Sequence, residues 1–344
     1  MPLDKKLTIN WSNIMLKKYL NTFDGFNLID IGSSGGLDKI WKPYKSFINL
    51  IGFDPNEEEC KRMSCLPSGF RTAKYIPYAI SGSSGENILY KTKSIYCYSL
   101  LKPNKEWLDR FTFSDLFEIT GQEKIQTRTL KEIKELKGLE VDIIKTDTQG
   151  LELPILKNAG EFLEKAFYVE TETGFVENYI GETTYAQIDE FMRSQGFILF
   201  DINTSHRISR KNNFSKEKTN AEQILWCEAV WLKDYVALSK RDINIIRRLS
   251  KDKILKILLI CSIHGCLDYG YELAQLFNEF GFFAKDEFNS LSDKSAWDLH
   301  VDKKEQIKPD SVLTYLFRLL PQKIRMYFYD SVSKSIYKKN LLKF

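Results

Sequence analysis

The first residues that could take part in binding or catalysis lie where an apolar run meets a loop of small side chains. Asp30 stands near the end of that run, and Gly32, Ser33, Ser34 and Gly35 follow it. Small residues let the backbone approach a ligand closely, and the helix that begins there offers free N–H groups. Ser34 occupies the place of the second glycine that a pyrophosphate-binding loop requires. The loop therefore favours S-adenosylmethionine, which has no phosphate, with Asp30 near its ammonium group; an ordinary strand-to-helix turn is the alternative.

Two further strand ends extend this predicted cofactor site. Asp54 follows Gly32 by 22 residues and precedes Pro55, which ends the strand. An acid at the tip of the second strand accepts hydrogen bonds from ribose hydroxyls. At the third strand end, Ala79 and Ile80 could give the adenine ring apolar cover and a backbone N–H. Taken singly, these residues could equally be a surface acid and core packing.

A second group of acids lies at the ends of the fourth and fifth predicted strands. Asp147 follows the fourth strand, and Glu170 and Glu172 end the fifth. Carboxylates that converge there could act as a general base for a hydroxyl, bind a polar substrate, or hold a divalent metal through oxygen ligands. The alternative is that they are solvated acids, and metal use stays undecided. Glu152 fits a helix start as well as a functional role, and Lys145 is given no role.

These residues need a sheet whose strand ends meet at one edge. Apolar runs alternate with helical patterns, which predicts an α/β fold with a mostly parallel sheet covered on both faces. A helix over 185–194 leads into a strand at 197–202, and another strand follows at 225–232 without an intervening helix. The last strand should therefore insert antiparallel, which gives the seven-stranded Rossmann-like sheet of class I methyltransferases. The other runs are 27–31, 48–53, 71–80, 141–146 and 166–170.

The chain of 344 residues is long enough for one large domain with additions at both ends. We expect a helical lead-in over 1–24, with a helix at 11–21, a cofactor-binding domain over 25–238 and a helical C-terminal domain over 239–344. The formal net charge is only +4, with the excess of lysine and arginine in the last part of the chain. That part could pack on the core, form a homodimer or contact a membrane surface.

The cysteines and the N-terminus bear on the compartment. The six cysteines include no pair with CxxC spacing, so a structural zinc site is not expected. MPLDKKLTIN lacks an apolar signal core, and the longest apolar stretch, Ile254–Ile263, is too short to span a bilayer. The sequence therefore predicts a cytoplasmic protein, with peripheral contact to a membrane surface as the alternative.

Over residues 25–235 the sequence resembles the FkbM family of methyltransferases in the order and spacing of its motifs. The motifs are IDIGSSGG, GFDP, YAISGSSGE, TRTLKEI, VDIIKTDTQGLELPILKNAG, FYVETE and GFILFDI. The resemblance implies methylation, with S-adenosylmethionine, of a hydroxyl on a small metabolite, a sugar or a glycan. By position, the residues implied at the cofactor are Asp30, Gly32 and Asp54, and those at the active site are Asp147, Glu152 and Glu170.

Three other classes of protein are alternatives to a hydroxyl methyltransferase. A nicotinamide oxidoreductase needs a GxGxxG turn and a proton donor such as a Tyr-x-x-x-Lys pair, which the sequence does not offer in a suitable place. A base amino methyltransferase carries Asn/Asp-Pro-Pro-Tyr/Phe where this chain has 147–150, DTQG. Nucleic acid is thus an improbable partner, although ribose methylation stays open because basic residues in the tail could hold phosphate. A silent binding module is the third class.

Overall fold

The computed structural model describes most of the chain, in two compact units. The larger unit is Trp11–Asp298, and the smaller one combines Met1–Asn10 with Leu299–Phe344. Strand β1 (Ile9–Trp11), whose first two residues belong to the smaller unit, pairs with β14 (Leu299–Val301) in a two-stranded sheet. The described residues are 9–11, 19, 22–37, 39–66, 68–212, 222–292 and 299–301.

Two expected elements fall on residues that are not described. Of the helix expected over 11–21, only Trp11, in β1, and Tyr19, in a helical conformation, are described. The helical pattern at 311–339 lies outside the described residues altogether. The division at 24 and 238 stays a prediction, although the larger unit includes residues on both sides of position 238.

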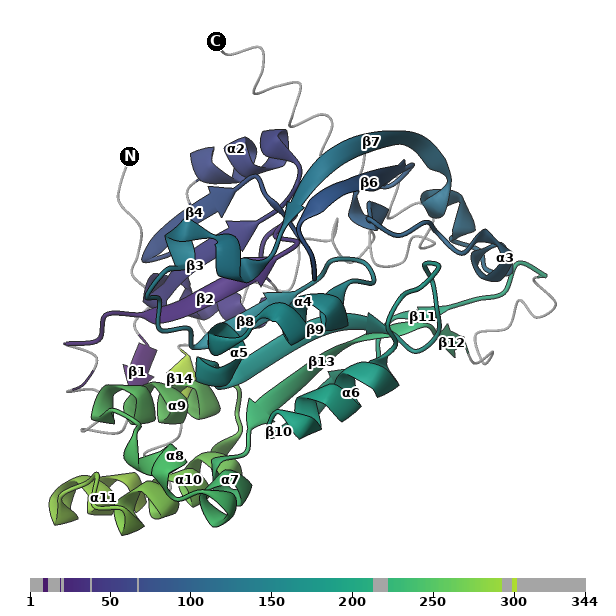
Figure 1. Cartoon of the computed structure of the whole chain (residues 1–344). Coiled ribbons are helices and arrows are strands. Elements are labelled where there is room, and N and C mark those ends of the chain that lie inside the picture. Colours follow the sequence, from purple (N-terminus) through teal and green to yellow (C-terminus); the bar gives the residue numbers. More distant parts are fainter. Residues whose placement is uncertain are drawn as a thin grey trace, which may run out of the picture. The chain divides into compact units, whose positions relative to one another are not determined.

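A seven-stranded sheet with strand order β10-β13-β9-β8-β2-β3-β4 forms the centre of the larger unit (Figure 1). Strands β9, β8, β2, β3 and β4 run parallel, and β13 is antiparallel to both of its neighbours, β10 and β9. The predicted Rossmann-like fold with an inserted last strand is therefore confirmed. The bounds are β2 (Phe26–Ile31), β3 (Ile48–Phe53), β4 (Thr72–Ile76), β8 (Ile143–Thr146), β9 (Tyr168–Gly174), β10 (Phe197–Asn203) and β13 (Trp226–Lys233).

Helices cover both faces of this sheet. On one face, apolar side chains of α4 (Glu152–Asn158), α5 (Glu161–Lys165) and α6 (Tyr185–Ser194) join the main core with those of β2, β8, β9 and β13 (Figure 1). On the other face, Trp41 of the 3₁₀ helix η1 (Lys39–Phe47) packs edge-on against Tyr168 of β9. Burial on both faces explains why these strands read as continuous apolar runs.

A smaller sheet stands beside the main one and was only partly predicted. It consists of β5 (Ala79–Ile80), β7 (Ile119–Arg128) and β6 (Gly85–Thr92) in that order. The single strand expected over 71–80 is two strands, because the chain turns at Pro77 and pairs β5 with β7 instead of continuing β4. Strand β7 is not evident from the sequence, since most of its side chains are exposed and its apolar periodicity is weak.

Helices follow β13, as the predicted C-terminal extension requires. They are α7 (Tyr235–Arg241), α8 (Asn244–Arg247), α9 (Lys251–Ile263), α10 (Leu267–Glu279) and α11 (Lys285–Ser292). Nearly every side chain of α9 is buried, so this helix is part of the core of the larger unit. Among the described residues, no helix combines the length and the apolar character needed to cross a membrane.

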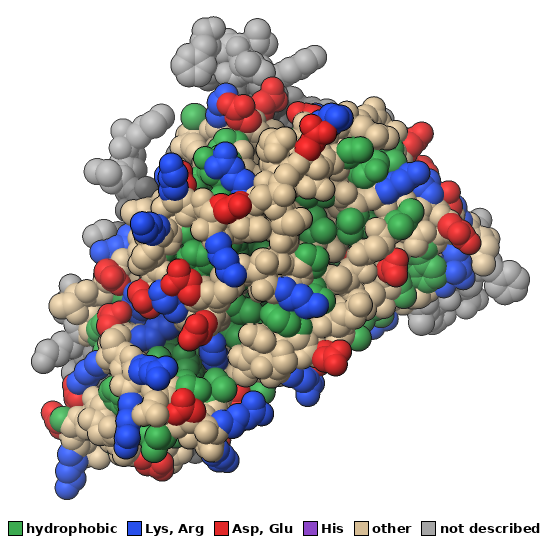
Figure 2. All heavy atoms as spheres, in the orientation of Figure 1, with side chains coloured by type: hydrophobic (Ala, Val, Ile, Leu, Met, Phe, Trp, Pro, Cys, Tyr) green, Lys and Arg blue, Asp and Glu red, His purple; other side chains and the backbone are tan. Residues whose placement is uncertain are grey.

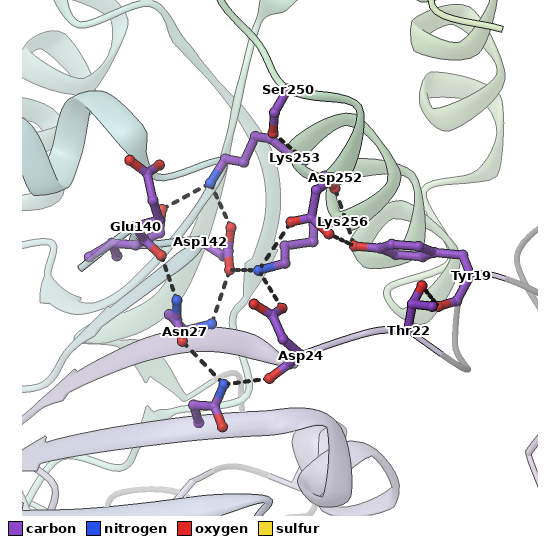
Figure 3. Close-up of polar contacts among 12 residues, drawn as sticks. Tyr19, Thr22, Asp24, Asn27, Glu140, Asp142, Ser250, Asp252, Lys253 and Lys256 are labelled. Carbon is purple, nitrogen blue, oxygen red and sulfur yellow. Dashed lines mark hydrogen bonds and ion pairs between the residues drawn. The ribbon is translucent and has the colours of Figure 1, made fainter. Parts of the chain in front are cut away.

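A buried ion cluster joins α9 to the amino end of the sheet (Figure 3). Asp142, just before β8, forms ion pairs with Lys253 Nζ at 2.6 Å and with Lys256 Nζ at 3.5 Å. The backbone N–H of Asn27 also donates to Asp142, at 3.0 Å, and Asp24 lies 3.0 Å from Lys256. All the polar atoms of the Asp142 carboxylate are thus paired, which is the condition for burying a charge at tolerable cost.

We predict that Asp142→Asn strongly destabilises the protein. The change leaves Lys253 and Lys256, both almost fully buried, without their shared counter-charge, and breaking a buried pair typically costs about 3–5 kcal/mol. The matched control is Asp252→Asn, because Asp252 also pairs with Lys256 but is about half exposed (51%); it should cost less than about 1 kcal/mol. Urea unfolding measures both, and equal losses would contradict the assignment.

Candidate active site

The small-residue loop after β2 touches the end of β8. The N–H groups of Gly32 and Ser33 both donate to the carbonyl oxygen of Phe53, at 2.8 and 3.0 Å. Gly32 has φ +82°, and a Cβ atom on it would lie 1.8 Å from the carbonyl oxygen of Asp147. The N–H of Asp147 in turn donates to Ile31 at 2.8 Å. Only glycine fits here, and the close approach sets Asp147 beside the predicted cofactor loop.

Asp30 is fully buried one row below that loop. The sheet register sets Asp30 opposite Lys145 and Lys145 opposite Glu170. Lys145 Nζ lies 3.5 Å from the Asp30 carboxylate, yet neither Asp30 oxygen has a hydrogen-bond partner among the described residues. Burial raises the pKa of Asp30, and the ammonium of Lys145 opposes that rise. A buried carboxylate with open acceptor positions suits a positively charged donor such as the ammonium group of an amino acid.

Lys145 compensates for several acids at once. Burial alone would lower its pKa, but the charges of Asp30, Asp147, Glu170 and Glu172 hold that pKa above its ordinary value. The sequence analysis gave Lys145 no role, because only the register shows that it stands between acids on both sides. Within the described part of the chain, no three His, Cys, Asp or Glu residues are grouped so as to hold a metal ion.

Asp54 lies directly after β3, where the sequence predicted a ribose acceptor. Its Oδ1 accepts the N–H of Asn56 at 2.8 Å, and the carboxylate is almost fully buried. Burial raises the pKa of Asp54 to about 6, while backbone hydrogen bonds from Asn56 and Ser34 oppose the rise. The helix α2 (Glu57–Cys65) begins after this turn, and its Glu59 accepts the N–H of Gly35 at 3.3 Å. Asp54 and the loop are therefore joined by backbone contacts at one edge.

Ala79 and Ile80 are buried, but they belong to β5 of the smaller sheet and not to the tip of β4. The residue of β4 nearest to Asp30 by register is Tyr75, with Gly52 of β3 between them. The Tyr75 hydroxyl is buried without a hydrogen-bond partner in the described residues, and burial raises its pKa to about 12. Tyr75 is a further candidate residue of the cofactor site. It is not evident from the sequence, since its alignment with Asp30 depends on strand register.

Glu152 holds the loop that follows β8. Its Oε1 accepts both the N–H and the hydroxyl of Thr148 at 2.8 Å, and its Oε2 accepts the N–H of Gly150 at 3.1 Å. Glu152 is the first residue of α4 and is buried. The carboxylate is thus occupied by the loop, and whether Glu152 has a functional role besides starting the helix stays a prediction.

The loop held by Glu152 presents Gln149, which links two acids. Gln149 Nε2 donates to Asp147 at 2.8 Å and to Glu172 at 2.9 Å, and its Oε1 accepts the hydroxyl of Tyr179 at 2.9 Å. Burial and then the charge of Asp147 raise the pKa of Glu172 well above its ordinary value, while the hydrogen bond from Gln149 opposes that rise. The structure therefore brings Asp147 and Glu172 together, and an amide that sequence reasoning missed makes the connection.

Glu170 lies on the same face of β9, one row further from the edge. Its Oε2 accepts the indole N–H of Trp41 at 3.3 Å and the hydroxyl of Tyr168 at 3.0 Å. The side chain is nearly fully buried. The role of Glu170 in catalysis stays a prediction from the sequence.

The family comparison identifies a domain within the larger unit. Residues 41–199 match the family model of the methyltransferase FkbM domain. This range begins after the first loop and ends in β10, so it includes Asp54, Asp147, Glu152 and Glu170. No curated protein sequence matches the chain.

Solved structures give distant similarities. Magnesium protoporphyrin IX methyltransferase from Synechocystis, with bound S-adenosylmethionine, is 10% identical with a TM-score of 0.31, over 63% of this chain and 76% of that one. The 1,6-didemethyltoxoflavin-N1-methyltransferase of Burkholderia thailandensis is 9% identical with a TM-score of 0.27, over 64% and 79%. A TehB-like S-adenosylmethionine-dependent methyltransferase of Corynebacterium glutamicum is 12% identical with a TM-score of 0.28, over 64% and 87%.

We predict that Gly32→Ala costs clearly more stability than Gly138→Ala. Both glycines have a left-handed backbone, with φ +82° and +77°, but nothing lies within 4 Å of a Cβ atom at Gly138. The control should lose about 1–2 kcal/mol, the backbone penalty alone. Gly32→Ala should lose about 1–3 kcal/mol more, since the added methyl must displace the carbonyl of Asp147. Urea unfolding of both variants checks this, and equal losses would show that the loop yields without cost.

Proposed function

Because residues 41–199 belong to the methyltransferase FkbM domain family and the chain is an S-adenosylmethionine-dependent methyltransferase, we propose that its acceptor is a hydroxyl group. The acceptor molecule would be a sugar, a glycan or another small metabolite. The observation that carries the proposal is the polar edge formed by Asp147, Gln149 and Glu172, which adjoins the glycine loop. These groups offer hydrogen-bond acceptors and donors to a hydroxyl and its neighbours.

The residues predicted for the cofactor fit its groups chemically. The buried Asp30 carboxylate has open acceptor positions for the ammonium group, and the loop of Gly32, Ser33, Ser34 and Gly35 permits close backbone approach. Asp54 would accept the ribose hydroxyls, and Ala79 and Ile80 keep their proposed place beside the adenine. Bound S-adenosylmethionine supplies a methyl group that its sulfonium already activates.

The remaining work of the enzyme is alignment and proton removal. A hydroxyl oxygen must be held in line with the methyl carbon, and effective alignment alone can supply several kcal/mol of the barrier. In this proposal Asp147 orients the hydroxyl, because the hydrogen bond from Gln149 fixes its carboxylate. Glu152 acts through Gln149 by fixing the loop, and Glu170 acts through Lys145 by completing the row of charges.

One described face of the protein has a distribution of charge that favours a small acceptor over a nucleic acid. On the face drawn in Figure 2, Lys and Arg alternate with Asp and Glu over helices α7–α11, so the two signs are mixed there. A nucleic-acid surface is normally a continuous basic stripe. Ribose methylation is therefore kept as an outcome of the acceptor test below.

We predict that S-adenosylhomocysteine binds more weakly below pH 6. The pKa of Asp54 in the free protein is about 6, and the ionised carboxylate is the better acceptor for two ribose hydroxyls. Affinity should thus be full above pH 6 and fall by up to about tenfold per pH unit below it. Calorimetry between pH 5 and 8 measures the effect.

The control for this prediction is Asp54→Asn. It should bind about 1.5–3 kcal/mol more weakly at pH 8, because a charge-assisted hydrogen bond is lost, and its affinity should lose the dependence on Asp54 ionisation. An unchanged pH profile in Asp54→Asn would assign the titration to another group. Absence of binding by the wild type at high micromolar ligand, or binding of NADH instead, would overturn the proposed function.

We predict methyl transfer to a hydroxyl acceptor that depends on Asp147. Tritiated S-adenosylmethionine is supplied with methyl glycosides, nucleosides and simple phenols, and transferred label is counted. Asp147→Asn should slow transfer about 10²-fold, because the hydroxyl is no longer held in line with the methyl group, with S-adenosylhomocysteine affinity and melting temperature nearly unchanged. Label on nucleosides alone would favour ribose methylation, whereas full activity in Asp147→Asn would remove Asp147 from the reaction.

A further inference from the structure

A histidine and a glutamate pair at the carboxyl edge of the sheet, outside every residue considered so far. His206 follows β10, and its Nε2 lies 3.3 Å from Oε1 of Glu228 on β13. The other oxygen of Glu228 accepts Asn203 Nδ2 at 2.6 Å. The imidazole stacks on Trp226, with ring centroids 5.2 Å apart and planes 23° apart. The ring is therefore oriented from two sides, by a carboxylate and by an indole.

The sheet register brings this pair to the proposed active site. Glu228 stands directly opposite Glu172 of β9, so the two side chains share one face of the sheet. Glu172 is joined through Gln149 to Asp147, and Asp147 touches the glycine loop. The pair of His206 and Glu228 thus lies at the same end of the sheet as this polar edge, on the neighbouring strand.

His206 is also the histidine suited to carry a proton. The chain has three histidines, and the side chain of His300 is not described. His264 packs between Trp41 and Tyr168, with ring centroids 4.4 Å from both, and burial lowers its pKa to about 3. The side chain of His206 is 29% exposed, so it can exchange protons with solvent.

The neighbouring acids are poorly suited to accept a proton. Glu172 accepts an amide hydrogen bond from Gln149 at 2.9 Å. Asp147 accepts an amide hydrogen bond from Gln149. The hydrogen bond to His206, against the effect of burial, holds the pKa of Glu228 below its ordinary value, so Glu228 is ionised and can orient the imidazole. An imidazole oriented by a carboxylate is an effective general base near neutral pH.

Resting on the proposed hydroxyl methylation, we propose that His206, oriented by Glu228, accepts the proton of the acceptor hydroxyl. With Nε2–H donating to Glu228, Nδ1 is the free acceptor atom. The hydroxyl oxygen forms the new bond to the methyl carbon, and the carbon–sulfur bond breaks with its electron pair left on sulfur. The hydroxyl proton goes to Nδ1 and later to solvent. The charged groups that face this pair are Glu172 from β9 and Lys145 from β8.

The test uses the positive charge of the cofactor as a probe of distance. Imidazole resonances of the full-length protein are followed by NMR from pH 5 to 9 in two complexes, with S-adenosylmethionine and with S-adenosylhomocysteine. The two ligands differ by one methyl group and one positive charge. If His206 faces the methyl group, its titration midpoint should be lower in the S-adenosylmethionine complex by about 0.5–1 pH unit, since a cation roughly 8 Å away disfavours imidazolium.

Two variants and one internal control complete this experiment. His206→Gln assigns the resonance, and Glu228→Gln should lower its midpoint in both complexes while retaining affinity for both ligands. His264, buried on another part of the same face, should show no titration in this range. Equal midpoints in the two complexes, with both ligands bound, would overturn the inference. Failure of the wild type to bind either ligand would instead overturn the proposed function, and the inference with it.

A kinetic measurement then separates a base from a merely structural histidine. With the acceptor labelled in the transfer assay, wild-type kcat should fall on the acid side as the imidazole is protonated. His206→Gln should lose this limb of the pH profile and about 10²–10⁴-fold in kcat, with KM for S-adenosylmethionine little changed. A retained acid limb in His206→Gln, at equal stability, would exclude His206 as the proton acceptor.

Discussion

The ion pair between Lys145 and Asp30 is the interaction on which the polar edge depends. Asp30 is fully buried, and a lone carboxylate in that position would cost several kcal/mol or remain protonated. Lys145 also interacts with Asp147, Glu170 and Glu172. One ammonium therefore permits a cluster of acids at the strand ends, where the sheet would otherwise be destabilised by their mutual repulsion.

The two ends of the sheet use buried charge in opposite ways. At the amino end, Asp142 is paired with two lysines and a backbone N–H, so its hydrogen-bonding capacity is used within the protein. At the carboxyl end, the oxygens of Asp30 make no hydrogen bond among the described residues, and its single lysine lies 3.5 Å away. The satisfied cluster stabilises the fold, whereas unused acceptors at a buried edge indicate a place that a ligand completes.

The sequence predicts most of the fold because burial on both faces leaves a plain pattern. Strands β2, β3, β8 and β9 are apolar runs, and the absence of a helix between β10 and β13 correctly indicated the antiparallel insertion. Strand β7 was missed since its side chains are largely exposed. The division of the strand at 71–80 was also missed, because the partner that captures β5 is that same unpredicted strand.

The positions of candidate residues at strand ends could be predicted from the sequence, whereas positions that depend on strand register or on loop conformation could not. Asp30, Asp54 and Asp147 occupy the expected positions, but the importance of Lys145 follows only from its place between two acidic strands. His206 lies in a polar stretch whose sequence indicates neither a helix nor a strand. Glu228 has the pattern of an outward-facing residue in an ordinary strand. Their pairing requires the hairpin of β10 and β13 to be known.

Gln149 shows how the loop after β8 maintains this arrangement. Its φ of +58° makes it the one residue other than glycine with positive φ in the described part of the chain, and such a conformation costs on the order of 1–3 kcal/mol. Three hydrogen bonds from the loop to Glu152, and one from Ser99 to the Gln149 carbonyl, offset that cost. A relaxed backbone would turn the amide away from Asp147 and Glu172, and the two acids would then repel each other. The strained backbone of Gln149 thus keeps an amide donor between two carboxyl groups. Glu152 contributes to the site because it holds this loop, although it contacts no group predicted to bind a ligand.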